Sequence, residues 1–420
     1  MNYREALSFV HSRQKFGSRP GLDSIRRITE LCNNPQRDMR FIHIAGTNGK
    51  GSVSTMLSNI LIESNKKIGL YISPYVIDFR ERIQINGEMI SKKDFARIIT
   101  LLAPLVERID GEGLTVTEFE LITCAAFIYF KEKGCDFAVL EVGMGGRLDA
   151  TNIIESPEVS VITRIDLDHT AVLGDTVSQI SAEKCGIIKK STPIVMYPDQ
   201  YKEAADIVSK TAQLNGSELV IPSTDFAYED NGICGSSINY KGMEFNLRLI
   251  GAHQRLNAAT AIEAALKIGI SPDIIVSGIE KTLFAARMEL VCDNPVVLLD
   301  GAHNPNGAKA LSSALKDIFV DKKVVAVMGM LADKDVDETL STLAPCFSDI
   351  ITVKVPTPRT MTASELKKVA QKYCPSVAVA DSYSRAIALS RSIAGDNPVV
   401  VCGSLYLASV IRPKLIKFYK

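Results

Sequence analysis

A glycine-rich turn between a buried strand and a helix is the feature that most constrains this chain. Residues 41–57 read FIHIAGTNGKGSVSTML, with an apolar run of strand length before the turn and apolar residues at helical spacing after it. Such a strand–turn–helix unit directs backbone N–H groups and a helix N-terminus at one point, where a phosphate can bind. The spacing differs from G-x-x-x-x-G-K-[ST], because the first two glycines are three residues apart and Gly51 separates Lys50 from Ser52. The stretch is therefore either a phosphate-binding loop of different geometry or a plain turn.

Strand-like and helix-like segments alternate along most of the chain, which is typical of an α/β fold with mostly parallel sheets. The pattern predicts strands at 135–143 and 159–166, antiparallel strands within 217–250, and helices at 50–64, 118–133, 178–188 and 254–269. It restarts near residue 295 with a strand, a polar loop and a helix, followed by strand-like runs at 323–329, 349–355, 376–380 and 398–402. We therefore expect a mostly parallel, phosphate-loop domain over 1–292 and a smaller Rossmann-like α/β domain over 293–420.

The charge balance argues against nucleic acid or a membrane as the main partner. The 420 residues include 48 Lys plus Arg and 48 Asp plus Glu, so the formal net charge is zero. No apolar run approaches the ~20 residues that span a bilayer. The nine cysteines are scattered without the C-x-x-C pairs of zinc sites. We expect a cytoplasmic protein with reduced thiols, and a monomer.

Polar side chains follow three predicted strands, at the ends where parallel α/β sheets bind ligands. Glu141 ends the strand in LEVGMGG, and its carboxylate is a possible ligand of Mg²⁺ or simply a solvated acid. His169 follows Asp166 and Asp168 after the next strand, and His303 lies in DGAHNPNG. A single histidine is as often a packed residue as a functional one, so these residues remain candidates at this point.

Six motifs taken together give the chain a family resemblance. The stretches HIAGTNGKGS, LEVGMGGRLDATN, DHTAVLG, SAEKCGIIK, GAHQRLNAATAI and DGAHNPNG occur in this order between about residues 20 and 405. The set resembles the folylpolyglutamate synthase/dihydrofolate synthase family of the Mur ligase superfamily, in which G-T-N-G-K-G-S is itself the phosphate loop. The resemblance implies a Mur-ligase-like ATP-binding domain over 1–292 and a glutamate ligase type domain over 293–420.

The resemblance also implies roles for individual residues. The expected ATP contacts are Gly49, Lys50, Gly51, Ser52, Asn257, Arg287 and Asp300. The expected Mg²⁺ ligands are Ser73, Glu141 and His169, and the expected pterin contacts are Thr117, Glu118, Phe119, Glu120 and Leu148. Lys50, Lys184 and His303 are the catalytic candidates, and Lys184 matches a lysine that carries a carbamate in relatives. One departure is Tyr75, where relatives often have histidine.

The expected reaction is ATP-dependent ligation of L-glutamate to a folate or dihydropteroate carboxylate through an acyl phosphate. A Mur-type ligase for peptidoglycan precursors is one alternative, although the phosphate loop at residue 46 leaves no room before it for a UDP-sugar domain. Another alternative is a non-ligase ATPase, which would hydrolyse ATP without glutamate. For Lys184, the alternative to a carbamate is a surface lysine paired with Glu183 or Asp175.

Overall fold

The phosphate loop lies at the centre of the larger, N-terminal sheet. In the computed structural model, which describes residues 1–17, 21–320 and 322–419, this eight-stranded sheet has the order β4-β3-β2-β5-β1-β6-β7-β8. The first two strands in that order form an antiparallel edge, and the others pair in parallel. The strands are β1 Arg40–Ala45, β2 Ile68–Tyr71, β3 Ile83–Ile85, β4 Glu88–Met89, β5 Phe137–Glu141, β6 Val159–Ile162, β7 Ile194–Met196 and β8 Leu219–Val220.

The chain order reverses at β1, which pairs with β5 on one side and β6 on the other. In open α/β sheets, ligands bind beyond the carboxyl end of the strands at such a switch point. The loop 46–49, Glu141 and the segment that carries His169 follow β1, β5 and β6 respectively, so the topology brings them to one edge of the sheet.

Helices cover both faces of this sheet because its strands are apolar on both sides. One core contains α1 Tyr3–Ser12, α2 Asp23–Leu31, α4 Lys92–Gly111 and α5 Glu118–Glu132. The opposite core contains α3 Lys50–Glu63, α9 Ala252–Lys267 and α10 Pro272–Glu280, and a third cluster lies under α6 Thr170–Leu173, α7 Val177–Cys185 and α8 Lys202–Leu214. Short 3₁₀ turns complete the chain at η1 Arg13–Phe16, η2 Pro35–Asp38, η3 Phe79–Arg82, η4 Ala150–Ile153, η5 Gly232–Cys234 and η6 Ala344–Cys346.

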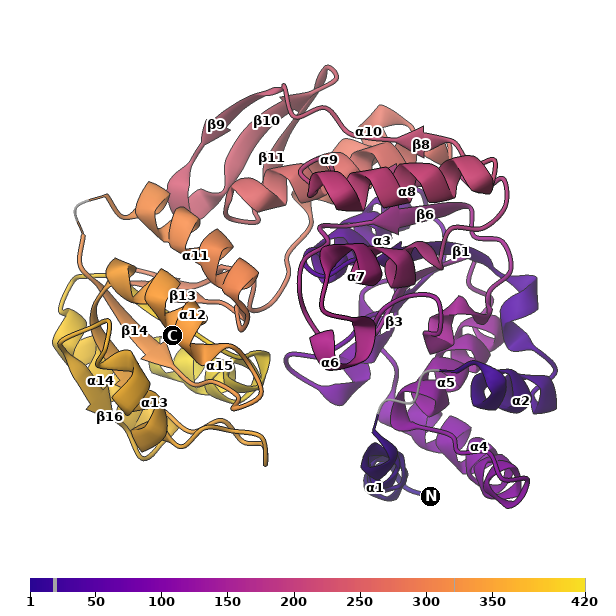
Figure 1. Cartoon of the computed structure of the whole chain (residues 1–420), viewed down its shortest axis with the longest axis horizontal. Coiled ribbons are helices and arrows are strands. Elements are labelled where there is room, and N and C mark those ends of the chain that lie inside the picture. Colours follow the sequence, from indigo (N-terminus) through magenta and orange to yellow (C-terminus); the bar gives the residue numbers. More distant parts are fainter. Residues whose placement is uncertain (18–20, 321, 420) are drawn as a thin grey trace.

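A small antiparallel sheet, as predicted for 217–250, packs on α9 and α10. Its strands are β9 Ala227–Asp230, β10 Ser236–Tyr240 and β11 Met243–Leu247, and β11 alternates buried and exposed residues. The buried Tyr240 hydroxyl donates to Glu263 Oε1 at 2.6 Å and ties the sheet to α9. Figure 1 shows this sheet above α11, at the junction of the two larger parts of the molecule.

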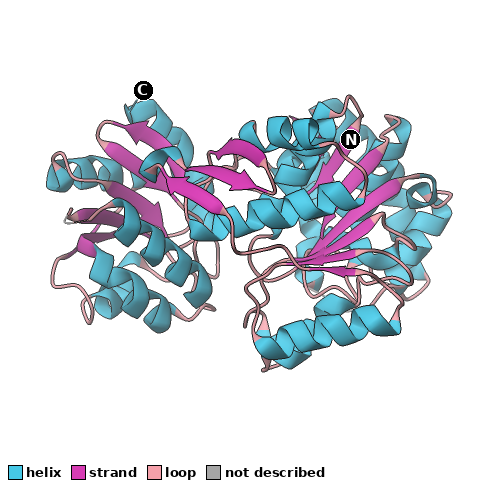
Figure 2. Ribbon diagram, turned by 90° about the horizontal axis from the view of Figure 1, so that it is seen from above, coloured by secondary structure: helices cyan, strands magenta, loops and turns pink. Residues whose placement is uncertain are grey.

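The C-terminal part is a second α/β layer structure beside the first (Figure 2). Its six-stranded sheet has the order β12-β13-β17-β14-β15-β16, with β12 Glu289–Asp293, β13 Val296–Leu299, β14 Val324–Met328, β15 Phe347–Thr352, β16 Val377–Val379 and β17 Val399–Cys402. One face packs against α11 Pro305–Ile318, α12 Val336–Leu343 and α13 Ala363–Ala370, and the other against α14 Tyr383–Ala394 and α15 Leu405–Tyr419.

These features confirm the predicted fold class, with small differences in element bounds. The predicted helix at 178–188 is α7, which ends at Cys185, and the one at 254–269 is α9, which begins at Ala252. The predicted division after residue 292 falls inside β12, which pairs with β13, so the change of sheet lies within 281–288. Within the described ranges, no helix is long and apolar enough to cross a membrane.

Candidate active site

The glycines of the phosphate loop allow a close approach of α9 to the start of α3. Gly49 precedes the helix with φ +87°, a left-handed conformation that favours glycine. A Cβ at Gly49 would lie 2.6 Å from Asn257 Oδ1, and a Cβ at Gly51 would lie 2.8 Å from the Phe284 ring. The buried Asn257 is therefore held against the loop.

Two lysine side chains meet at the Gly46 carbonyl. Lys50 Nζ lies 3.1 Å from Gly46 O and 3.2 Å from Thr47 O, and Lys184 Nζ lies 2.9 Å from Gly46 O. Lys184 is only 4% exposed, and burial together with the neighbouring Lys50 lowers its pKa to about 7. The surface-lysine alternative is wrong, because Glu183 pairs instead with Arg147 at 2.7 Å.

Glu141 is a buried carboxylate beside the loop and not a solvated acid. Its Oε2 accepts a hydrogen bond from the Ser73 backbone N–H at 3.3 Å and would lie 3.6 Å from a Cβ at Gly51. Burial raises its pKa to about 7, although Lys50, the Ser73 N–H and Arg287 act in the opposite direction. The structure therefore brings Glu141 and Ser73 together at the start of α3.

His169 lies at the same edge of the sheet but makes a different set of contacts. It has φ +53°, begins α6, and donates its backbone N–H to Asp168 Oδ1 at 2.8 Å. Loss of solvation lowers the pKa of its imidazole, with Lys334 and Lys50 acting in the same direction and Asp168 opposing them. In the described ranges, its ring makes no hydrogen bond to Glu141 or Ser73.

The residues present fit Mg²⁺ held jointly by protein and phosphate. Across residues 1–17, 21–320 and 322–419, no three His, Cys, Asp or Glu side chains gather into a ready-made cage. Mg²⁺ sites on nucleotides usually have one or two protein ligands, with phosphate oxygens and water completing the octahedron. Glu141 supplies a buried carboxylate whose hydrogen bond to Ser73 is long, so an oxygen lone pair is available to a hard cation.

The opposite wall of the site begins with Arg287 and Asp300. Asp300 accepts backbone N–H groups of Met288 at 2.8 Å and Ala302 at 2.7 Å, which fixes the turn after β13. Arg287 lies with its guanidinium carbon 5.2 Å from the centre of the Phe284 ring. Burial raises the pKa of Asp300 and lowers that of Arg287, and each charge opposes the shift of the other.

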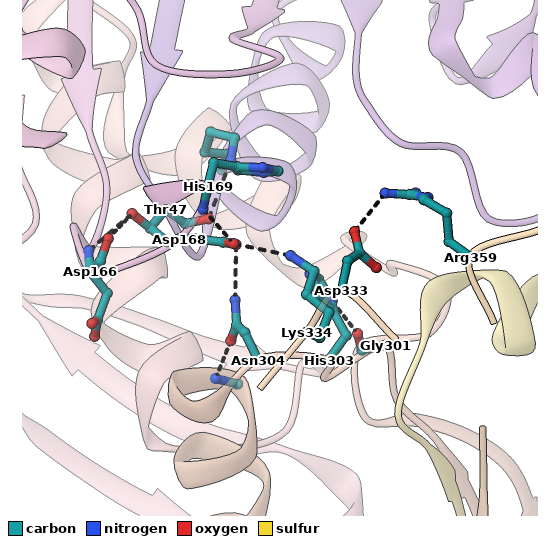
Figure 3. Close-up of polar contacts among 12 residues, drawn as sticks. Thr47, Asp166, Asp168, His169, Gly301, His303, Asn304, Asp333, Lys334 and Arg359 are labelled. Atoms are coloured by element: carbon teal, nitrogen blue, oxygen red, sulfur yellow. Dashed lines mark hydrogen bonds and ion pairs between the residues drawn. The ribbon is translucent and has the colours of Figure 1, made fainter. Parts of the chain in front are cut away.

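His303 lies just beyond this turn, with a defined tautomer. Its Nδ1 lies 2.9 Å from Gly301 O, so Nδ1 carries the proton and Nε2 has a free lone pair. Burial lowers its pKa to about 4, and Lys334 adds to the effect. Figure 3 shows His303 beside Lys334 and near Asn304, all on the C-terminal side of the His169 segment.

The segment expected to hold the pterin also begins α5. Thr117 and Glu120 form a capping box, in which Glu120 Oε2 accepts from Thr117 N at 2.8 Å and from Thr117 Oγ1 at 2.7 Å. The T-x-x-E pattern is a sequence signal for such a cap. Glu118 pairs with His11 at 3.0 Å.

The other pterin candidates lie around the glycine-rich turn after β5. The Phe119 ring lies so close to Gly143 that a Cβ there would be 2.5 Å from it. Leu148 is half-buried in the same turn. Nearby, the Tyr75 ring packs edge-on against Phe79, with centroids 5.5 Å apart.

Two groups of residues were not predicted from the sequence. Asp149 is buried and organises the turn after β5, because its Oδ2 accepts the N–H groups of Gly143 and Met144, both at 3.0 Å. The D-x-T-N pattern that follows the glycines was the available signal. Lys334 pairs with Asp168 at 3.0 Å, a contact over 166 residues of sequence that no local pattern indicates.

Comparison with known families supports the arrangement of the two halves. Residues 44–265 match the Mur ligase middle domain, and residues 286–405 match the Mur ligase, glutamate ligase domain. The chain is 34% identical over 435 residues to the folylpolyglutamate synthase of Lacticaseibacillus casei, covering 99% of both chains. It is also 34% identical over 429 residues to the dihydrofolate synthase/folylpolyglutamate synthase of Bacillus subtilis, covering 98% of this chain and 99% of the relative.

Solved structures agree with the same assignment. Mycobacterium tuberculosis folylpolyglutamate synthase complexed with ADP and AMPPCP superposes with a TM-score of 0.91 at 29% identity, covering 99% of both chains. An FPGS–AMPPCP–folate complex has a TM-score of 0.85 at 34% identity, covering 99% of this chain and all of the other. The chain therefore belongs to the folylpolyglutamate synthase/dihydrofolate synthase family, a family of ATP-dependent glutamate ligases built from Mur ligase domains.

Proposed function

We propose that this protein joins L-glutamate to the carboxylate of both dihydropteroate and reduced folates, with the residues around Gly46 as the phosphoryl-transfer site. The observation that carries the proposal is the meeting of Lys50 and Lys184 on the Gly46 carbonyl. The helix N-terminus and the Lys50 ammonium present positive charge at one point, where the triphosphate of ATP can bind, and Lys184 reaches the same carbonyl. A turn with only a structural role would not require two lysine side chains at one carbonyl.

The nucleotide would be held from both sides of the cleft. Gly49, Lys50, Gly51 and Ser52 provide backbone N–H groups, an ammonium and a hydroxyl for the phosphates. Asn257, Arg287 and Asp300 face them from α9 and the C-terminal part. Lys50 now donates to two carbonyls of its own loop, and bound phosphate would replace those acceptors with stronger, charged ones.

Ser73, Glu141 and His169 are the proposed Mg²⁺ ligands, joined by a carbamate on Lys184. When bound, Mg²⁺ supplies positive charge that offsets the charge on the transferred phosphoryl group. The buried Lys184 amine, with its lowered pKa of about 7, has the neutral form that reacts with CO₂. A carbamate there replaces a cation with an oxygen ligand for the metal.

The proposed chemistry has two steps. The pterin acid's carboxylate attacks the γ-phosphorus, the bond to ADP breaks, and an acyl phosphate forms. The amine of L-glutamate then attacks the acyl carbon, the bond to phosphate breaks, and an amide forms. The amine must lose a proton in this second step. We assign this proton to His303 Nε2, because burial keeps the ring neutral and its Nδ1 is already bonded to Gly301 O.

The remaining roles follow from the site's layout. Thr117, Glu118, Phe119, Glu120 and Leu148 are the proposed pterin contacts, with the Phe119 ring as the stacking surface beside Gly143. The two catalytic parts are an ATP-binding domain and a glutamate ligase type domain that divide within 281–288. We expect a cytoplasmic monomer. The FPGS–AMPPCP–folate complex supports the choice of substrates, because the related chain binds both an ATP analogue and folate.

The test is ADP release by the purified protein with Mg²⁺, measured with dihydropteroate and with tetrahydrofolate, each with and without L-glutamate. We expect glutamate-dependent ADP release with both acids. ADP release that ignores glutamate and both acids would instead support a non-ligase ATPase. Release with tetrahydrofolate alone would restrict the activity to polyglutamylation.

A further inference from the structure

A set of side chains bridges the two domains next to His169. Asp168 accepts from Lys334 Nζ at 3.0 Å through Oδ1 and from Asn304 Nδ2 at 3.3 Å through Oδ2. The Lys334 and Asp168 side chains are only 15% and 16% exposed. Figure 3 shows Lys334 and Asn304 both pointing at Asp168 from the C-terminal side. The contact is thus a well-shielded ion pair with a second donor, unlike the exposed ion pairs on the surface.

A second bridge lies beside the first and reaches the phosphate loop. The Asn306 side-chain amide contacts Asp166 Oδ2. Asp166 in turn donates its N–H to Thr47 Oγ1 and accepts from that hydroxyl through its carbonyl, both at 2.9 Å. A continuous chain of hydrogen bonds therefore runs from the start of α11 to the loop that holds Lys50.

The C-terminal donors are themselves firmly held. Asn304 caps α11 by accepting from Gly307 N at 2.8 Å, and Lys334 lies in the loop between β14 and α12. The neighbouring Asp333 pairs with Arg359 at 2.9 Å, which ties that loop to residues 357–360 (Figure 3). Because both loops follow strands of the C-terminal sheet, they transmit the position of that sheet, and of His303, to the His169 segment.

We propose that Asp168 and Lys334, assisted by Asn304 and by the Asp166–Asn306 contact, form a cross-domain latch that positions the C-terminal domain for amide formation. The latch includes none of the phosphate loop's glycines and no residue of the pterin segment, and it reaches the phosphate loop only through the contact of Asp166 with Thr47. Its role is to fix the distance between His303 and the acyl group on the other domain. Lys334 and Asp168 are therefore positioning residues, and the inference rests on the ligase function proposed above.

The size of the effect follows from the geometry that the latch maintains. Removing the Lys334 ammonium leaves Asp168 as a shielded carboxylate without its charged partner, which favours separation of the two loops. A misplacement of about 1 Å between reacting groups can lower a rate about 100-fold. The pterin contacts all lie in the N-terminal domain, so the loss belongs in kcat and not in the KM for the pterin acid.

The experiment compares Lys334→Met, Lys334→Arg, Asp168→Asn and the Asp168→Asn/Lys334→Met double variant with the wild type. Lys309→Met is the matched control, because Lys309 is 64% exposed and its partner Glu338 is 3.6 Å away in the same domain. We expect Lys334→Met to lower kcat about 10- to 100-fold, with the KM for dihydropteroate within about twofold of the wild type. Lys334→Arg should retain most activity, and the control should match the wild type.

Three further measurements test the latch. If the two residues act as one pair, the double variant falls no further than the lower single variant. Small-angle X-ray scattering should show a larger radius of gyration for Lys334→Met than for the wild type, whatever reaction the protein catalyses. If Lys334→Met does not fold, Asn306→Ala, which leaves no buried charge, should lower kcat with the same unchanged KM.

Wild-type kcat and radius of gyration in Lys334→Met would overturn the latch, as would multiplicative losses in the double variant. An equal loss in Lys334→Arg or wild-type kcat in Asn306→Ala would also overturn it. A wild-type protein that does not need glutamate would contradict the proposed function instead. The scattering comparison would still test the domain contact by itself.

Discussion

Lys184 allows the most direct test of the site. An ordinary lysine has a pKa of 10.5, whereas burial and the nearby Lys50 bring that of Lys184 to about 7. At pH 7 the neutral amine then rises from about one molecule in three thousand to about half, a gain of roughly 1500-fold. Only the neutral amine reacts with CO₂, so this lysine is far more reactive toward it than a surface lysine.

We predict that Lys184 carries a carbamate in the active enzyme. Incubation with ¹³C-labelled bicarbonate should give one carbamate carbon signal in the wild type that is missing from Lys184→Ala. Activity of the wild type should fall in CO₂-free buffer and return with bicarbonate. Lys184→Ala should lose most of its activity, and a short carboxylate such as acetate should partly restore it by supplying the missing oxygen ligand.

Lys189→Ala is a suitable control, because Lys189 lies nearby in sequence and its ammonium donates to the Asn152 carbonyl at 3.4 Å, away from the phosphate loop. It should keep both the carbamate signal and the activity. Full activity in CO₂-free buffer, with no labelled carbon at Lys184, would refute the reasoning. If Lys184 were labelled in the wild type but Lys184→Ala were fully active, the modification would have no role in the reaction.

Three other predictions follow from single residues. Lys50→Met should lower kcat at least about 100-fold while unfolding at the wild-type temperature, because its hydrogen bonds reach only carbonyls of its own loop; a wild-type rate would remove Lys50 from the phosphate site. Gly49→Ala should cost about 1–2 kcal/mol of unfolding free energy from backbone strain and also weaken ATP binding through contact with Asn257. Gly113→Ala, at φ +85° with no neighbour within 4 Å, should show the strain alone. Burial, with a smaller effect of Lys189, lowers the pKa of His43 to about 3. Below pH ~6.5 the imidazole is therefore protonated in the unfolded chain only, and the folded protein loses stability as the pH decreases. The loss is about 2 kcal/mol at pH 5, and urea unfolding of His43→Asn should show a smaller loss between pH 7 and pH 5.

Much of the site could be predicted because it follows the ends of buried strands. Glu141 ends β5 and His169 follows β6, so the parallel topology alone brings both to the edge where β1 leads into the phosphate loop. The glycine spacing was informative for the same reason. Gly49 must be left-handed and leave room for Asn257, a requirement that ordinary residues cannot meet. Local pattern and sheet geometry suffice for such positions.

Other features depend on pairings that no local pattern contains. The sequence pattern predicted a domain division after residue 292, but Asn294 and Pro295 form the turn between β12 and β13, and only strand pairing assigns β12 to the C-terminal sheet. The Lys334–Asp168 contact likewise joins two loops whose proximity depends on how the domains meet. Thr117 and Glu120 show the reverse case, since the T-x-x-E pattern already specified a helix cap and therefore a structural role beside the expected pterin contact.

The zero net charge of the chain conceals a strongly uneven site. Lys50 and Arg287 act on the carboxylate of Glu141; Glu141 and Lys184 are buried, and Lys50 and Arg287 are half-buried. Burial favours the neutral form of both side chains, because it raises the pKa of Glu141 and lowers that of Lys184. Their charged forms therefore depend on neighbouring charges. Bound Mg²⁺ would favour the ionised carboxylate of Glu141, and ATP would bring negative charge to the Lys50 ammonium. In the unliganded site both lysines contact one backbone carbonyl, so the Lys50 ammonium and the Lys184 amine are already in position before ATP, Mg²⁺ or CO₂ arrives.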